Sequence, residues 1–147
     1  MFTIRQVTTD KELQDALHVR RVVFIEEQQV PEDLEIDEHD QLSDPTIHVI
    51  AYRDIEPAAT GRLRSPEQGV GKIERVAVKQ DTRGTGLGRE LMLHLEKIAV
   101  QQGNSTLKLS AQLQAQPFYE KLGYEGYGEI FDDAGIDHIM MKKQLNR

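Results

Sequence analysis

The 147-residue sequence contains no cysteine. This absence excludes disulfide bridges, thiolate-bound metals and cysteine nucleophiles together, so any thiol chemistry must come from a bound cofactor. No apolar run approaches the roughly 18 residues of a membrane-spanning helix, and residues 1–10 lack the charged, apolar and small succession of a secretory signal. We therefore expect a cytoplasmic globular protein with no membrane partner.

Basic residues are fewer than acidic ones, 18 against 25, which gives a net charge of −7. Such a chain is poorly suited to binding the phosphates of nucleic acid, so no nucleic-acid partner is expected. Between Arg21 and Arg53 there is neither Lys nor Arg. The acidic residues of that stretch are Glu26, Glu27, Glu32, Asp33, Glu35, Asp37, Glu38, Asp40 and Asp44. This acidic segment is either a solvated loop or a surface that attracts a cationic partner.

The five histidines are scattered along the chain. His18, His39, His48 and His94 show no spacing typical of metal ligands, and the sequence therefore predicts no metal site.

The length matches a single domain, and neither a repeat nor a linker divides residues 1–147. Alternating and helical apolar patterns predict ten elements in the order β, α, β, β, β, α, β, α, β, β. These are strands over 1–7, 47–52, 58–64, 72–78, 106–111, 124–131 and 137–143, and helices over 11–27, 87–99 and 117–122. Hairpins mixed with helical crossovers predict an α/β fold with a mixed, mostly antiparallel sheet flanked by helices.

A glycine-rich loop, Arg83-Gly84-Thr85-Gly86-Leu87-Gly88, joins the strand over 72–78 to the helix that follows. Glycines let a ligand approach the backbone, and the first N–H groups of a helix attract anions, so the loop is a candidate phosphate site. A P-loop would require GK followed by Ser or Thr, whereas Arg89 stands five residues after Gly84. A dinucleotide fold would require GxGxxG in repeated parallel βαβ units, and the hairpins before this loop do not provide them.

The stretch Arg83-x-x-Gly86-x-Gly88 after a strand resembles the acyl-CoA signature of the GNAT superfamily of N-acetyltransferases. The stretch from Phe118 to Tyr124 resembles the second signature of that family. Val19–Pro31 and Asp133–His138 are similar to stretches of small stand-alone bacterial members called YjcF-like or ElaA-like. The resemblance covers essentially the whole chain and implies the GNAT fold, with acetyl-CoA as co-substrate and a small-molecule amine as acceptor.

By this resemblance the strand over 73–78 diverges from the strand over 106–111, and the pantetheine arm of CoA enters between them. Val76, Ala77 and Val78 would then provide main-chain contacts, and an N–H near Val78 would stabilise the oxyanion. The residues implied to hold the pyrophosphate are Arg83, Gly84, Thr85, Gly86, Leu87, Gly88 and Arg89. Gln112 or Gln114 stands where many members place an asparagine contact to the cofactor.

Tyr119 matches the family tyrosine that protonates the departing thiolate; as a structural residue it would instead be a core aromatic. Glu74 is the first candidate for the general base, because alternation places it on one strand face with Val76 and Val78. The alternative for Glu74 is an ion pair with Arg62 or Arg64. Glu26 and Glu27 are second choices, near the acceptor.

His138 belongs to the ending that the family shares and is a candidate for contact with the acceptor, or else a packed strand residue. The acidic segment favours a cationic primary amine as acceptor. Two other interpretations stay open: a non-catalytic acyl-CoA-binding or sensing module, and a protein that binds a partner through the acidic segment. The sequence also leaves a homodimer open.

Overall fold

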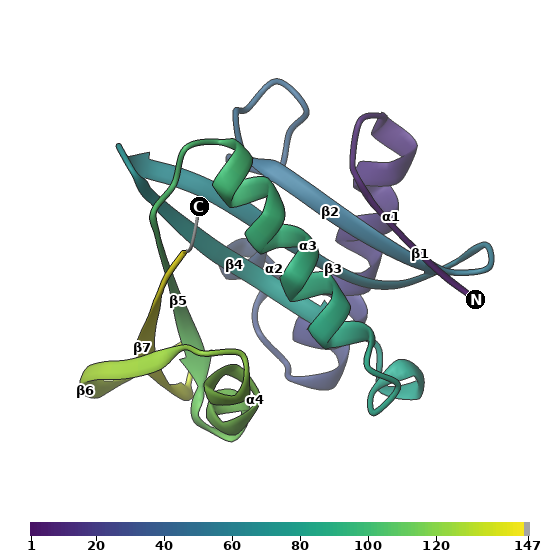
Figure 1. Ribbon diagram of the computed structural model, residues 1–147. Coiled ribbons are helices and arrows are strands. Elements are labelled where there is room, and N and C mark those ends of the chain that lie inside the picture. The colour runs from purple at the N-terminus through teal and green to yellow at the C-terminus, as the bar shows by residue number, and fades with distance from the viewer. Residues whose placement is uncertain (146–147) are drawn as a thin grey trace.

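The computed structural model describes residues 1–145, which form a seven-stranded sheet with helices on both faces (Figure 1). The N-terminal half contains β1 (Phe2–Gln6), α1 (Asp10–Arg20), η1 (Arg21–Glu27), α2 (Glu32–Glu35), β2 (Ile47–Arg53), β3 (Glu56–Glu67) and β4 (Val70–Val78). The C-terminal half contains η2 (Gln80–Thr82), α3 (Leu87–Gln101), β5 (Thr106–Gln112), η3 (Leu113–Ala115), α4 (Gln116–Lys121), β6 (Glu125–Asp133) and β7 (Ile136–Gln144).

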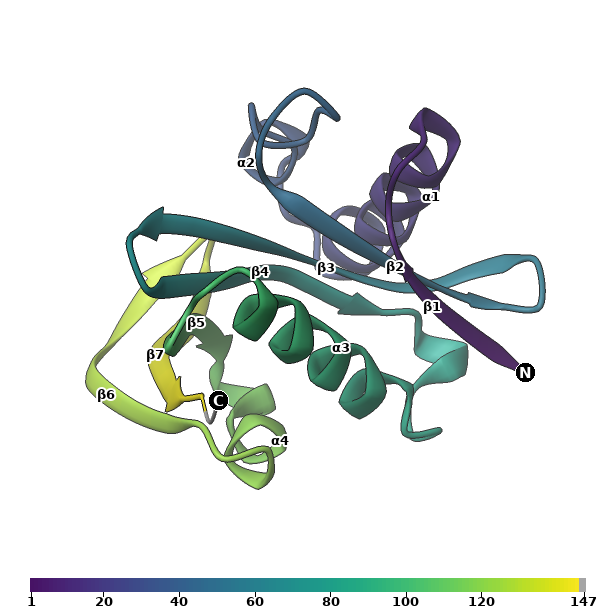
Figure 2. The same ribbon diagram turned by 45° about the horizontal axis from the view of Figure 1, so that its top comes forward.

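The strand order is β1-β2-β3-β4-β5-β7-β6, and every neighbouring pair is antiparallel except β4 and β5. Helix α3 is the crossover between these two parallel strands. The turned view separates three layers: α1 and α2 lie on one face of the sheet, and α3 and α4 lie on the other (Figure 2). The predicted mixed, mostly antiparallel α/β fold is confirmed.

The predicted helix over 11–27 is two consecutive segments. Helix α1 begins with a capping box, in which the Glu12 N–H donates to Thr9 Oγ1 (3.2 Å) and the Thr9 N–H donates to Glu12 Oε1 (3.2 Å). From Arg21 the chain continues as η1, a π-helix. π-Helical turns are rare in proteins, and those that occur are often found at functional sites. The acidic segment also contains a short helix, α2, that the sequence analysis did not predict.

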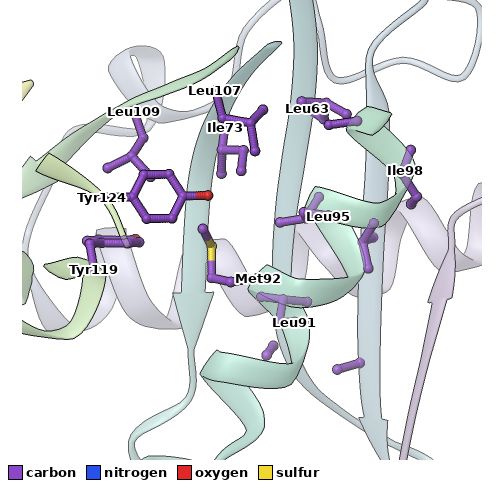
Figure 3. Packing of buried hydrophobic residues seen from close by; sticks show 14 of the residues in the cluster. Leu63, Ile73, Leu91, Met92, Leu95, Ile98, Leu107, Leu109, Tyr119 and Tyr124 are labelled. Atoms are coloured by element: carbon purple, nitrogen blue, oxygen red, sulfur yellow. The ribbon is translucent and has the colours of Figure 1, made fainter. Parts of the chain in front are cut away.

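The core lies between α3 and the sheet (Figure 3). Leu91, Met92 and Leu95 of α3 are fully buried against sheet residues such as Leu63 and Leu107. Each such side chain contributes roughly 1.5–3 kcal/mol on burial. A second cluster packs α1 against the opposite face of the sheet, through residues that include Leu13, Leu17, Ile50 and Ala77.

Candidate active site

The two parallel strands diverge beyond their first four residue pairs. β4 pairs with β5 only from Val70 opposite Thr106 to Ile73 opposite Leu109. Beyond that point β4 keeps only β3 as partner, and the last residues of β5 keep only β7. Backbone groups on the facing edges of both strands are therefore available to an extended ligand, as at any strand edge. Val76, Ala77 and Val78 lie in the part of β4 that pairs with β3 and has no partner strand on the side of β5.

A bulge at Arg75 marks the divergence. Arg75 has a positive φ of 57°, and between the pairs Thr60–Ala77 and Arg62–Glu74 one residue of β3 opposes two of β4. The extra residue reverses the alternation of side chains. Glu74 therefore lies beside Arg62, whereas Val76 and Val78 pack in the core beneath α3. The expectation that Glu74 shares a strand face with Val76 and Val78 is wrong, because a bulge cannot be read from simple alternation.

The glycine loop wraps the N-terminus of the 15-residue helix α3. Gly84 and Gly86 have φ of 80° and 86°, and a Cβ added to either would meet no atom within 4 Å. Because glycine has no side chain, the backbone adopts this left-handed conformation without strain, and the space above both residues stays open. The Leu87 N–H donates to Thr85 Oγ1 only at 3.4 Å. The next N–H groups, of Gly88 and Arg89, belong to the first turn of α3, whose donors have no acceptor inside the helix. This is the geometry of an anion site.

Phe118 borders the same loop and was not predicted as a site residue. It is 36% exposed, and a Cβ added to Gly88 would lie 3.4 Å from its ring and 3.6 Å from Val78 Cγ2. The position of Phe118 within the second family signature was the signal that could have identified it.

The side chain of Arg83 is engaged by the protein itself. Its Nε donates to the Val78 carbonyl (2.8 Å), and its two terminal nitrogens donate to the Glu27 carboxylate (2.7 and 2.8 Å). This pair lowers the pKa of Glu27. Since both side chains are more than one-third exposed, the pair is weak and can exchange for a stronger anion.

Side-chain hydrogen bonds also connect the end of η1 to the end of β5. Gln112 Nε2 donates to Gln28 Oε1 (2.8 Å), and Gln114 Nε2 donates to Gln112 Oε1 (2.9 Å). Glu27 and Gln28 therefore connect η1 to the loop after β4 on one side and to β5 on the other. Gln112 is the last residue of β5 and Gln114 lies in η3, and the Gln112 amide binds both Gln28 and Gln114.

Tyr119 is the buried residue of α4, 8% exposed, with its ring edge-on to those of Phe118 and Tyr124. Burial raises the pKa of Tyr119 to about 12, so the phenol carries its proton at neutral pH. Its hydroxyl has no hydrogen-bond partner within residues 1–145, and no polar side-chain atom there is fully enclosed without a partner. The hydroxyl is therefore not completely enclosed by the protein.

Glu74 is held by three cations. Oε1 accepts from Arg62 Nε (3.1 Å) and Arg64 Nε (2.8 Å), and Lys72 Nζ lies 3.4 Å from Oε2. Although burial opposes ionisation, these partners lower the pKa of Glu74 to about 2. A carboxylate with this pKa is a weak proton acceptor. The geometry favours the ion-pair interpretation of Glu74, and we do not assign the general base to it.

The acidic segment is largely neutralised by arginines. Buried Arg20 pairs with Glu35 and Asp40, and buried Arg62 pairs with Asp37 and Asp40. On the surface Arg21 pairs with Glu32, and Asp44 caps the Thr46 N–H. The segment therefore attaches to the sheet through ion pairs, and only Glu26, Asp33 and Glu38 lack an arginine partner or capping role within residues 1–145.

His138 lies on β7 opposite Gln112, stacked on Phe131 and 8% exposed. Within residues 1–145 no three metal-binding side chains gather, and no helix there is long and apolar enough to cross a membrane.

Known proteins are similar to this chain both in sequence and in fold. The profile of the acetyltransferase (GNAT) domain matches residues 9–145. The uncharacterized N-acetyltransferase YjcF of Bacillus subtilis is 43% identical over 135 residues, 91% of this chain and 94% of YjcF. The crystal structure of Escherichia coli ElaA has a TM-score of 0.86 at 25% identity, covering 97% of this chain and 99% of ElaA. An acyl-CoA N-acyltransferase from Pseudomonas aeruginosa has a TM-score of 0.83 at 33% identity, covering 97% and 98%.

Proposed function

Because the chain belongs to the GNAT acetyltransferase family, we propose that it transfers an acetyl group from acetyl-CoA to a primary amine, with both substrates bound at once. The observation that carries the proposal is the divergence of β4 and β5 directly beside a glycine loop that opens helix α3. An extended pantetheine arm fits the unpaired edge of β4, and a pyrophosphate fits the loop.

The loop residues fit the pyrophosphate by shape and by charge. Gly84 and Gly86 leave open space over the loop, and the N–H groups of Gly88 and Arg89 would donate to phosphate oxygens. Arg83 would exchange Glu27 for a phosphate, since charge-assisted contacts to phosphate are the stronger kind. Phe118 would cover the cofactor arm where it passes Gly88 and Val78.

The chemistry needs no protein nucleophile. The amine nitrogen attacks the thioester carbonyl carbon, and an N–H of β4 near Val78 stabilises the oxyanion, a contribution often worth about 2.7–4 kcal/mol. The C–S bond then breaks, and the Tyr119 hydroxyl gives its proton to the departing thiolate. Tyr119 is suited to this role because its hydroxyl is protonated, has no hydrogen-bond partner within residues 1–145 and is not completely enclosed.

The acceptor is proposed to be a small cationic amine. Because arginines pair with most of the acidic segment, the attraction rests mainly on Glu26, Asp33 and Glu38, which have no arginine partner within residues 1–145. The charge of the acceptor is therefore tested by comparing the rates with different amines.

Thiol release from acetyl-CoA tests the proposal. The purified chain is mixed with acetyl-CoA and putrescine, spermidine, tyramine or glucosamine, and free thiol is followed. Amine-dependent release supports transfer. Tight binding of acetyl-CoA without release for any amine would favour the alternative of a non-catalytic sensing module. Glutamate and aspartate, amines with a net negative charge, are run beside this panel, and either of them as the best acceptor would contradict the charge proposed for the acceptor.

A further inference from the structure

His138 lies on the face of the sheet where η1 crosses the diverging strands. It is in register with Gln112, so the two side chains share a face of the sheet. Gln112 binds Gln28 at the end of η1, which fixes that face as the one covered by α1 and η1. Gln112 is three residues beyond Leu109, the last β5 residue paired with β4, which is roughly 10 Å along the strand. His138 therefore lies where the two strands are already apart.

A backbone contact fixes the tautomer of the His138 ring. Nδ1 lies 2.7 Å from the Ile136 carbonyl oxygen, and a carbonyl oxygen can only accept. Nδ1 therefore carries a hydrogen, and in the neutral ring Nε2 carries a lone pair. The ring also stacks on Phe131, with centroids 5.9 Å apart and planes inclined by 27°. Both contacts hold the imidazole in one orientation.

Nε2 has no hydrogen-bond partner within residues 1–145. No polar side-chain atom there is both fully enclosed and without a partner, so Nε2 reaches solvent. The side chains that face the ring from neighbouring elements are Phe131 of β6 and Gln112 of β5, with Gln28 of η1 behind Gln112, and none of them titrates. Asp132 and Asp137 form the adjacent pair of the hairpin, on its opposite face. The lone pair of Nε2 is therefore free to take a proton.

Two of the three carboxylates considered as base are paired in the structure: Glu74 is held by Arg62, Arg64 and Lys72, and Glu27 pairs with Arg83. Glu26, the third, is exposed on η1 and has no arginine partner within residues 1–145. A cationic amine must lose a proton before its nitrogen can attack, so the reaction needs a proton acceptor on the acceptor side of the sheet.

We propose that His138 is this proton acceptor; the inference rests on the proposed acetyl transfer. The ammonium group of the acceptor gives one proton to His138 Nε2, and the freed nitrogen forms the C–N bond as it attacks the thioester. As the C–S bond breaks, Tyr119 protonates the thiolate. A second proton leaves the new amide nitrogen to solvent, and His138 and Tyr119 return to their starting states by proton exchange with water. The products are the N-acetylated amine and CoA.

The variant His138→Asn separates this role from a structural one. The asparagine amide can still donate to the Ile136 carbonyl, but no group replaces Nε2. We expect kcat/KM for the best amine of the putrescine, spermidine, tyramine and glucosamine panel to fall by about 10²–10⁴-fold. The fall of wild-type kcat/KM on the acid side should be absent from the variant, and acetyl-CoA should bind both proteins equally. Added imidazole should restore part of the activity of His138→Ala.

His18→Asn is the matched control, since His18 is exposed on α1, and it should behave as wild type in rate and pH profile. A His138→Asn enzyme within about threefold of wild type, with the same acid-side fall, would overturn the role of His138 alone. Absence of turnover by the wild-type chain with every amine would overturn the proposed function, and this inference with it.

Discussion

Glu74 is the residue at which a catalytic and a structural role predict opposite results. Its arginine partners lower its pKa from an ordinary 4.5 to about 2. At about 1.36 kcal/mol per unit, this difference corresponds to about 3 kcal/mol of stability at neutral pH. The side chain is 12% exposed, so solvent screening reduces this figure only modestly. Because the folded-state pKa is the lower one, the contribution is complete above about pH 4.5 and is lost as the pH falls toward 2.

Glu74→Gln keeps the shape of the side chain and removes its charge, which leaves Arg62 and Arg64 without their shared counter-ion. We expect the free energy of unfolding in urea at pH 7 to fall by about 3 kcal/mol, near the range for breaking a buried ion pair. The gap between wild type and variant should narrow as the pH is lowered from 4.5. The kcat of the folded variant should change by less than about threefold.

The matched control is Glu67→Gln, at an exposed glutamate of β3, which should leave the free energy of unfolding within about 0.5 kcal/mol of wild type. A hundredfold loss of kcat in Glu74→Gln with unchanged unfolding would refute this reasoning and return Glu74 to the role of base.

Three further predictions concern the cofactor and the acceptor. Tyr119→Phe should lower kcat by about 10²–10⁴-fold in the thiol assay and leave acetyl-CoA affinity unchanged; an unchanged kcat with chemistry rate-limiting would make Tyr119 a packing residue. Glu27→Gln should release Arg83 and tighten acetyl-CoA binding about two- to fivefold by calorimetry, whereas weaker binding would contradict the exchange. Replacing Glu26, Asp33 and Glu38 together by amides should lower kcat/KM for spermidine, most at low salt; a rate equal to wild type would make the acidic segment a solubilising surface.

The element order and the glycine loop could be predicted because each depends on residues close in sequence. Apolar periodicity marks α3, and Gly84 and Gly86 directly precede it. The same local reasoning missed the bulge at Arg75, because a bulge is a mismatch in the pairing of two strands and has no signal in the sequence of either strand. It therefore placed Glu74 on the wrong face.

The contacts that connect η1 to the site could not be predicted, since they join residues far apart in the chain. Arg83 meets Glu27 across 56 positions, and Gln112 meets Gln28 across 84. Counting charges along the sequence assigns a net negative charge to the acidic segment, but in the fold Arg62 and Arg75 of the sheet form ion pairs with it. The sequence identified Tyr119 through its family signature; whether its hydroxyl is free depends on packing that only the structure describes.

Calorimetric titration with acetyl-CoA tests most directly the claim that the loop and the diverging strands form a cofactor site. The wild-type chain should bind one acetyl-CoA, and Gly86→Asp should not, because it sets a carboxylate and a strained backbone where we propose that the pyrophosphate binds. Gly128→Asp is the matched control, at a glycine of β6 with a similar φ of 75° and equal open space, and it should bind as wild type. Absence of binding by wild type, or equal binding by a folded Gly86→Asp variant, would contradict the account.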